Sequence, residues 1–411
     1  AGGTYQLAEF KKGQFARFTA NPNFWGGKPS VDEVVIRKFN NADAMVAALK
    51  RGEVDFVQNV PEGQYLNLQK DPDFVTLEGS QGGFDELAIN MGDGLKKPHP
   101  ALLDPKVREA IAHAIDKKTI VDRVLRGIGE PAEALSPSAN PDWTPDIPED
   151  QRFDFDLEKS KQILEDAGYK DTDGDGIREM PGGGQPLNFR YAVRSESDPS
   201  PRIAEFITGW LKEIGIDTTQ KTYDDGQLTE VIGKGDYDMF VWGWTPFVDP
   251  DPMLSYFTCD QVSADPDDPS NYYNDANLCD PEYDKLYKQQ QTELDPAKRM
   301  DIVHEMLTRF YSHAGYLPLY TQGDLQAYRK DRFTGWQKQP ADIGPVLFSN
   351  SSPSYQTLKL ASATTGGASG GGDDGGGGGT GIIIALVAVG VVGAGGLLWA
   401  RSRRASADER E

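Results

Sequence analysis

Residues 200–216, SPRIAEFITGWLKEIGI, and residues 236–244, DYDMFVWGW, decide the fold class. The first stretch places its apolar side chains on one face of a helix, with Ser200 expected as the N-cap and Pro201 in the first turn. The second is a short apolar run that suits a buried strand. Because stretches of both kinds are mixed along the chain, the sequence predicts an α/β fold.

Four further segments predict helices. Asn41 is the expected cap of a helix that begins the stretch 41–57, ends at Gly52 and is followed by a strand. Asp104 and Pro105 are expected to start a long amphipathic helix. This helix is expected over residues 104–125, and the other two helices are expected over 156–169 and 296–314.

Length and charge restrict the class of protein. The chain has 411 residues, enough for two or three domains with a large core. Its net charge is 42 − 64 = −22, which repels phosphate backbones and anionic lipid. Nucleic acid is therefore not expected as a partner.

The C-terminal residues predict a tether and a membrane span. Residues 363–380 are rich in glycine and cannot bury a core. Residues 381–400 carry no charge and, as a helix, would be roughly 30 Å long, with Trp399 at one end. Because RSRR follows, the tail 401–411 is expected to be cytoplasmic and the large domain extracellular. The alternative is a buried core helix.

The chain opens with AGGTYQLAEF, which contains no methionine and no apolar leader segment. An exported domain needs such a leader, so we expect the sequence to be processed or truncated. Cys259 and Cys279 lie twenty positions apart, and outside the cell a disulfide is favoured over two free thiols.

Residues 170–183, KDTDGDGIREMPGG, begin like a calcium loop. Asp171, Asp173 and Asp175 take ligand positions 1, 3 and 5, and Gly176 takes position 6. Position 12 is a glycine instead of the required glutamate, and no second helix follows. Glu179 is a possible late ligand, so two interpretations stay open: a weak calcium site, or an Asp/Gly turn between a helix and a strand.

Residues 242–257, WGWTPFVDPDPMLSYF, combine aromatic side chains with two aspartates between prolines. Aromatic walls with few fixed charges are typical of a small-molecule pocket, and a buried aspartate there would pair with an ammonium group. The alternative is a core tryptophan pair beside a capping turn. The motifs of serine hydrolases, zinc peptidases and P-loop enzymes are absent, and the four histidines stand apart. No enzyme activity and no required cofactor are expected.

The stretch GTYQLAEFKKGQFARFTANPNFWGGKPSVDEVVIRKF resembles the extracellular solute-binding proteins, family 5, the peptide, dipeptide and nickel receptors of ABC importers. Similar stretches continue as LDPKVREAIAHAIDKKTIV, YDMFVWGWTPFVDPDPMLSYFTC and LCDPEYDKLYKQQ. The resemblance implies a bilobed, periplasmic-binding-protein-like fold of type II, truncated in its first lobe. The implied domains are lobe I (1–84), lobe II (85–321) and a return segment to lobe I (322–362).

The resemblance also implies roles for residues of the tryptophan loop. Trp242, Gly243, Trp244 and Thr245 match the loop that contacts the peptide main chain in peptide-binding relatives. Asp249 is the first candidate for the aspartate that holds the ligand's ammonium group, and Asp251 the second. Some relatives carry a cystine after this loop, which suits the two cysteines.

The sequence thus predicts a monomeric receptor that captures a short peptide outside the cell and passes it to an ABC permease. Receptors for nickel chelates or oligosaccharides are alternatives within the family. A calcium-stabilised adhesion protein and a surface hydrolase are alternatives outside it.

Overall fold

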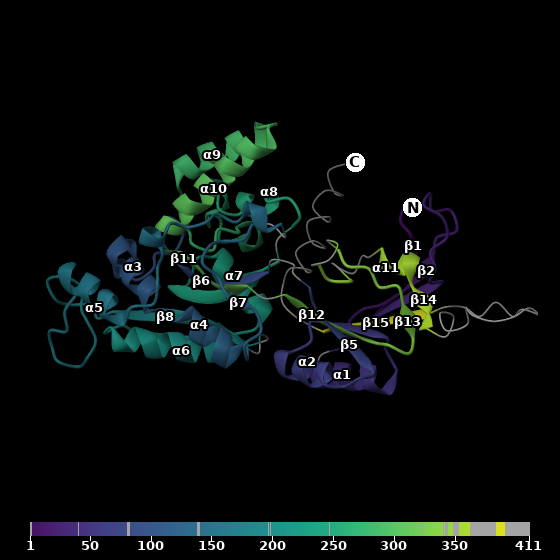
Figure 1. Ribbon diagram of the computed structural model, residues 1–411. Coiled ribbons are helices and arrows are strands. Elements are labelled where there is room, and N and C mark those ends of the chain that lie inside the picture. The colour runs from purple at the N-terminus through teal and green to yellow at the C-terminus, as the bar shows by residue number, and fades with distance from the viewer. Residues whose placement is uncertain are drawn as a thin grey trace, which may run out of the picture. The chain divides into compact units, whose positions relative to one another are not determined.

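The computed structural model describes residues 2–39, 41–79, 83–137, 140–195, 197, 199–245, 247–321, 323–339, 341, 344–347, 353–361 and 384–390. The chain divides into two compact units, shown in Figure 1. Unit 1 comprises residues 1–81 and 323–392, and unit 2 comprises residues 82–322 and 393–411. Both units combine helices with a sheet, as the α/β prediction requires. The predicted Gly-rich tether (363–380) and tail (401–411) lie outside the described residues.

Unit 1 is built on a seven-stranded sheet with the strand order β1-β2-β3-β15-β4-β12-β5. These strands are β1 (Tyr5–Lys11), β2 (Phe15–Ala20), β3 (Glu33–Phe39), β15 (Ile384–Gly390), β4 (Phe56–Gln58), β12 (Asp324–Arg329) and β5 (Phe74–Gly79). The remaining elements are α1 (Ala42–Arg51), α2 (Glu62–Gln69), β13 (Phe333–Thr334), α11 (Ser354–Thr357) and β14 (Lys359–Leu360).

The sheet contains a correction to the sequence analysis. The predicted membrane-spanning helix over 381–400 is wrong: residues 384–390 form strand β15, which pairs in parallel with β3 and with β4. Among the described residues, no helix is both long enough and apolar enough to span a membrane. The run IALVAVG is rich in β-branched residues, and an apolar run of this length fits a strand with neighbours on both sides. Periodicity alone does not separate such a strand from a helix.

Helix α1 follows its predicted limits. The Asn41 side chain accepts a hydrogen bond from the Ala44 N–H, which satisfies one of the free donors of the first turn. Gly52 ends the helix at φ 73°, a left-handed conformation that favours glycine. Met45 and Leu49 are fully buried, so the predicted apolar face is the one that packs inward.

Unit 2 is built on a six-stranded sheet with the order β7-β11-β6-β10-β8-β9. The strands are β7 (Glu130–Pro131), β11 (Tyr316–Thr321), β6 (Phe84–Ile89), β10 (Met239–Trp244), β8 (Asn188–Arg194) and β9 (Asp217–Tyr223). The longer helices are α3 (Pro105–Ala114), α5 (Leu157–Asp166), α6 (Pro199–Glu213), α7 (Asp225–Gly233), α9 (Pro281–Thr292) and α10 (Pro296–Ser312). The short turns are η1 (Pro100–Leu103), α4 (Lys117–Thr119), η2 (Ile120–Val124), η3 (Pro141–Trp143), η4 (Glu149–Gln151), α8 (Asp251–Ser255), η5 (Cys259–Gln261) and η6 (Pro269–Asn271).

The sheet of unit 2 separates two hydrophobic cores. Leu87 and Ile89 of β6 pack with α3, α5 and α6, whereas Phe84 and Ala88 pack with α7, α8, α9 and α10. Alternate residues of a strand point to opposite faces, so a strand covered on both sides reads as a continuous apolar run. The same reason explains MFVW at the start of β10, where all four residues are buried.

Two helix predictions in unit 2 need correction. The single helix expected over 104–125 is interrupted at Ile115, which is extended (ψ 112°). Asp116 then caps a new turn by accepting a hydrogen bond from the Thr119 N–H. Ser200 does not cap α6, which begins at Pro199; its hydroxyl instead accepts a hydrogen bond from the Arg194 N–H.

Candidate ligand-binding site

The tryptophan loop begins at the end of β10. This strand lies between β6 and β8, so its last residues emerge from the middle of the sheet of unit 2. Trp242 is buried, at 7 % exposure, and the Arg194 guanidinium stacks 4.5 Å from the centre of its ring. The Arg194 Nε donates a 2.6 Å hydrogen bond to Asp225 Oδ1, so its charge is neutralised within the unit.

Gly243 occupies a position where a larger residue does not fit. A Cβ atom there would lie 2.2 Å from the Asp85 Oδ1 and 3.2 Å from the Phe84 carbonyl oxygen. Any side chain would therefore push β6 and β10 apart or displace the Asp85 carboxyl. This carboxyl also accepts a hydrogen bond from the Tyr320 hydroxyl of β11, so β6, β10 and β11 meet at this point.

Trp244 is half-buried and held on two sides. Its indole Nε1 donates a 3.0 Å hydrogen bond to the Asp275 Oδ2. Its ring contacts Tyr256, with centroids 4.9 Å apart, and Tyr256 in turn stacks on Tyr273 at 5.1 Å. Three aromatic side chains thus form one row, and Thr245 lies exposed beyond it.

The two candidate aspartates have partners within unit 2. Both carboxyl oxygens of Asp249 accept 2.8 Å hydrogen bonds from the Arg299 guanidinium, which lowers the pKa of Asp249. The Asp251 Oδ1 accepts a 2.7 Å hydrogen bond from the Gln290 amide. A ligand ammonium group would have to compete with these partners, so the role predicted for either aspartate stays a prediction.

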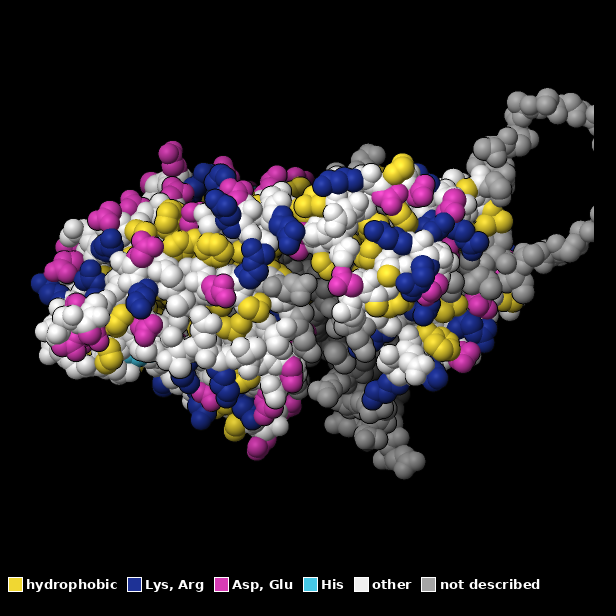
Figure 2. Space-filling view, turned by 90° about the horizontal axis from the view of Figure 1, so that it is seen from below, with side chains coloured by type: hydrophobic (Ala, Val, Ile, Leu, Met, Phe, Trp, Pro, Cys, Tyr) yellow, Lys and Arg dark blue, Asp and Glu magenta, His cyan; other side chains and the backbone are white. Residues whose placement is uncertain are grey.

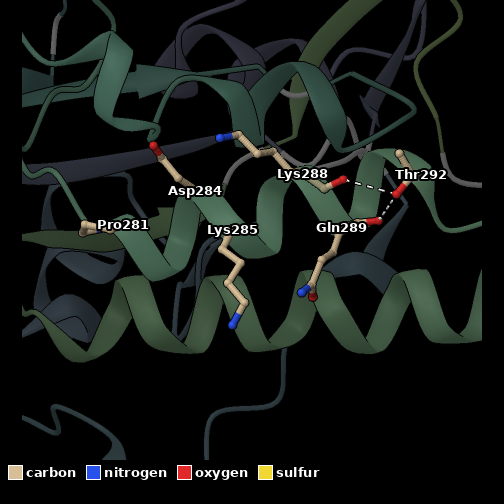
Figure 3. A pocket seen from close by; sticks show the side chains of 6 residues that line it. All are labelled: Pro281, Asp284, Lys285, Lys288, Gln289 and Thr292. Atoms are coloured by element: carbon tan, nitrogen blue, oxygen red, sulfur yellow. Dashed lines mark hydrogen bonds between the residues drawn. The ribbon is translucent and has the colours of Figure 1, made fainter.

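Asp251 and Arg299 line a shallow surface pocket together with Gln290, Gln291 and Glu293. A second pocket runs along α9 and is shown in Figure 3. It is lined by Pro281, Asp284, Lys285, Lys288, Gln289 and Thr292. All six residues belong to one helix, so this is a groove on the helix surface, and none of the predicted site residues lines it. On the face in Figure 2, lysine and arginine side chains are interspersed with acidic ones.

The acidic loop is gathered into a compact group. One carboxylate oxygen from each of four residues lies within 4.8 Å of the other three; the residues are Asp171, Asp173, Asp175 and Glu179. The three aspartates also accept backbone hydrogen bonds from the loop, as an Asp/Gly turn requires. Glu179 is buried and accepts hydrogen bonds from the Thr172 N–H and hydroxyl, both at 2.7 Å. The turn is therefore formed, and its geometry also suits a cation.

Cys259 and Cys279 form a disulfide with Cα atoms 4.4 Å apart. The loop that they close contains Tyr273, which stacks on Tyr256 in the aromatic row, and Asp275, which accepts the hydrogen bond of the Trp244 indole. The Cys279 N–H donates a 2.7 Å hydrogen bond to Asp93 Oδ2, which fixes one end of this loop to the segment after β6.

Sequence analysis missed Arg194 and Asp275, both of which contact the tryptophans. Neither residue belongs to a local pattern. Arg194 ends β8, and Asp275 lies in a loop more than thirty positions after its partner Trp244. Only the pairing of the strands and the closed loop bring them to β10.

Comparison with known proteins gives the class. Residues 1–265 match the model of the bacterial extracellular solute-binding proteins, family 5 Middle. This match covers more than half of the chain, and the chain therefore belongs to this family of solute-binding proteins. The resemblance noted in the sequence is confirmed, and a family of binding proteins agrees with the expectation that the chain is not an enzyme.

Individual relatives share part of their length with this chain. The oligopeptide-binding protein AppA of Bacillus subtilis is 30 % identical over 254 residues, which cover 61 % of this chain and 44 % of the relative. Di/tripeptide-binding protein 2 of Pseudomonas aeruginosa is 25 % identical over 342 residues, covering 82 % and 59 %. The nickel-binding periplasmic protein of Escherichia coli is 26 % identical over 325 residues, covering 77 % and 58 %. The chain thus spans about half the length of the curated relatives it matches.

Solved structures show the same fold. The structure of AppA from Bacillus subtilis in complex with a nonapeptide aligns with a TM-score of 0.68 at 24 % identity, covering 87 % of this chain and 66 % of that one. NikZ from Campylobacter jejuni in complex with Ni(L-His) aligns with a TM-score of 0.71 at 21 % identity, covering 87 % and 68 %. The bilobed α/β fold of periplasmic binding proteins is therefore shown.

Proposed function

We propose that this protein is the substrate-binding component of an ABC importer, which binds short peptides outside the cell and delivers them to a membrane permease. The family match supports a solute-binding role, and two of the three curated relatives above are named for peptides. Its ligand-binding unit would be a lobe spanning residues 85–321, with residues 1–84 and 322–362 in the other lobe. The protein would act as a monomer and would need no catalytic residue.

The observation that carries this proposal is the end of β10. Trp242, Gly243 and Trp244 leave the middle of the sheet, where Gly243 keeps the strand close to β6 and Trp244 heads an aromatic row. Strand-end backbone groups can hydrogen-bond to an extended peptide, and aromatic side chains provide a flat apolar wall for its side chains. Such contacts bind a peptide main chain with little dependence on its sequence.

Titration calorimetry tests the proposal with a library of di- to pentapeptides, a nickel–histidine chelate and an oligosaccharide mixture. We expect peptides to bind, Trp244→Ala to weaken binding at least tenfold, and Trp25→Ala to leave it unchanged. Trp25 is a matched control because it is 88 % exposed and lies in unit 1. Tight binding of the chelate without peptide binding would instead favour a nickel receptor, a class represented among the relatives.

We also propose that the acidic loop holds a calcium ion as a stabilising group separate from the ligand site. The four carboxylates within 4.8 Å support this proposal, because calcium takes six to eight oxygen ligands and extracellular sites are weak. Millimolar calcium is expected to raise the melting temperature of the protein but not of Asp173→Asn. An equal effect on both proteins, or on neither, would contradict the proposal.

A further inference from the structure

A glutamate with no exposed surface lies in the core beneath the candidate site. Glu86 of β6 pairs with Trp242 of β10 and with Pro318 of β11, so its strand has a neighbouring strand on each side. Its side chain lies on the face of the sheet that carries Phe84 and Ala88, which packs against α7, α8, α9 and α10. Neither carboxyl oxygen has a hydrogen bond of acceptable geometry among the described residues. A buried carboxyl without a hydrogen bond lowers the stability of the fold unless it is protonated and has a hydrogen-bond partner.

A second buried carboxyl lies close to the first. Asp275 is 3 % exposed, and its Oδ2 accepts the hydrogen bond from the Trp244 indole. The charge of Asp275 acts on Glu86, so the two groups lie within electrostatic range in the same core. The Tyr316 hydroxyl lies beside Glu86 and feels the charge of both carboxyls.

The segment around Asp275 is firmly placed. The Tyr237 hydroxyl donates a hydrogen bond to the Asp275 carbonyl oxygen, and Asn277 donates one to the Tyr237 hydroxyl. The N–H groups of Met91 and Asp93 donate to the carbonyl oxygens of residues 276 and 277. With the disulfide at its ends, these bonds fix the loop and keep the Asp275 carboxyl in contact with the Trp244 indole.

We propose that Asp275, which forms a pair of buried carboxyls with Glu86 in this core, positions the Trp244 indole through its hydrogen bond and makes the anchorage of this indole depend on pH. In this pair Asp275 is a positioning residue, because it contacts Trp244 and not the ligand. The pair is distinct from Asp249 and Asp251, which have partners on the surface of unit 2.

The physical basis is that two carboxyls in one apolar site cannot both ionise. Burial raises the pKa of Asp275 to about 7, against which the Trp244 hydrogen bond acts, and burial also raises the pKa of Glu86 well above its usual range, assisted by the charges of Asp275 and Asp85. Above the midpoint, Asp275 is a carboxylate that strengthens its bond to the indole N–H. Below it, Asp275 is neutral and the indole is held by a weaker bond. The Tyr237 hydroxyl donates to the backbone carbonyl of Asp275, and the charge of Asp275 also acts on Tyr256.

The pair also affects stability. The folded protein holds the Asp275 proton more tightly than the unfolded chain, in which an aspartate titrates near 3.9. Its contribution to stability is therefore complete below about pH 4 and is lost as the pH rises through about 7. Asp275→Asn removes this loss, because an asparagine does not ionise.

Nuclear magnetic resonance tests the proposal on the full chain with ¹⁵N-indole-labelled tryptophan. Each of the seven tryptophans carries one indole N–H, and comparison with Trp244→Phe identifies the signal of Trp244. We expect this signal to titrate with a midpoint near pH 7, at the pKa of Asp275, and to stop titrating in Asp275→Asn. The signal of Trp336, which lies in unit 1, is the internal control and should not move in parallel.

Variants of Glu86 test whether the second buried carboxyl affects the titration of Asp275. Glu86→Gln keeps a polar side chain of the same size, so the midpoint should stay within a few tenths of a pH unit. Glu86→Leu makes the surroundings of Asp275 more apolar, so the midpoint should rise by about one unit. Tyr316→Phe tests the hydroxyl in the same way, and thermal melts establish that each variant is folded. Equal midpoints in Glu86→Gln, Glu86→Leu and the parent protein would overturn the proposal, as would a Trp244 signal that does not titrate.

One further measurement rests on the proposed function. If Trp244 contacts the peptide, affinity should differ at least threefold between pH 5.5 and pH 8 in the parent protein and not in Asp275→Asn. A titrating indole without any peptide binding would refute the proposed ligand and leave the carboxyl pair standing. Peptide binding with a Trp244 signal that does not titrate would refute the carboxyl pair and leave the proposed ligand standing.

Discussion

Unit 1 and unit 2 assemble their sheets from different parts of the chain. In unit 1, strand β15 comes from residues 384–390 and lies between β3 and β4, which belong to the first sixty residues. In unit 2, all six strands come from one continuous segment, and a disulfide closes the loop beside β10. Unit 1 therefore takes its strands from two parts of the chain that lie on either side of unit 2 in the sequence, whereas every strand of unit 2 comes from residues 84–321. The predictions below separate the stabilisation of the two units.

The largest expected effect concerns β15. Val387 pairs with Ile36 on one side and with Phe56 on the other, so Val387→Pro removes a ladder donor within the sheet. We expect unit 1 to lose about 3 to 4 kcal/mol, while unit 2 is unchanged. Hydrogen exchange resolved by segment measures this as faster exchange in β3 and β4 but not in β10. Val387→Thr, which keeps a β-branched residue, is the control, and unchanged exchange in both variants would show that β15 does not support the sheet.

Removal of the disulfide should act on the other unit. Replacing Cys259 and Cys279 by serine opens a loop of twenty residues, and the chain-entropy model gives a loss of about 3 kcal/mol. Urea unfolding, monitored by segment-resolved hydrogen exchange, should show this loss of stability in unit 2 alone. An equal change in unit 1 would mean that the two units do not unfold separately.

A smaller effect is expected at Asp280 in unit 2. Its buried carboxyl caps α9 and binds Arg309 and His313. Burial alone would raise its pKa, but the hydrogen bonds from these two residues outweigh burial and lower the pKa to about 2. The stabilisation is therefore present above about pH 4, the range of an unfolded aspartate, and is lost as the pH falls toward 2.

Asp280→Asn keeps the shape of the cap but removes the charge. We expect a loss of about 2 kcal/mol at pH 7 and a smaller difference from the parent protein at pH 3, measured by urea unfolding. Glu282→Gln, which removes an exposed pair with Lys285 and a weaker charge interaction with Arg309, should have a much smaller effect. A pH-independent difference for Asp280→Asn would show that the ion pairs do not contribute.

The smallest effects compare one helix cap in each unit. Asn41 caps α1 of unit 1, and Asp224 caps α7 of unit 2 through a reciprocal pair of bonds with Gln227. Asn41→Ala and Asp224→Ala should each cost about 1 kcal/mol, because each removes the side-chain acceptor of one N–H in the first turn of its helix. Segment-resolved exchange should assign each loss to its own unit. Losses that spread over both units would contradict the separation of the units.

Local features of the fold were predictable from the sequence, but partners were not. The Asn41 cap, the Asp104 cap and the buried strand at β10 depend on neighbours in the sequence, and all three are present. The seven residues of β15 were predicted as part of a helix, because an apolar run carries the same signal in a membrane and inside a sheet. The tryptophan loop was recognisable from its composition, whereas Glu86 and Asp275 became visible only through strand register and loop closure.

Unit 2 begins and ends on neighbouring strands. Phe84 of β6 pairs with Thr321 of β11, and in unit 1 Gly79 of β5 pairs with Asp324 of β12. Residues 82–322 of unit 2 are thus inserted between two antiparallel strands that pair with each other, with entry and exit side by side. For protein engineering, we therefore expect residues 83–321 to behave as a cassette that folds when expressed alone, accepts circular permutation by joining its own ends, and can be replaced by a short turn that leaves β5 and β12 paired.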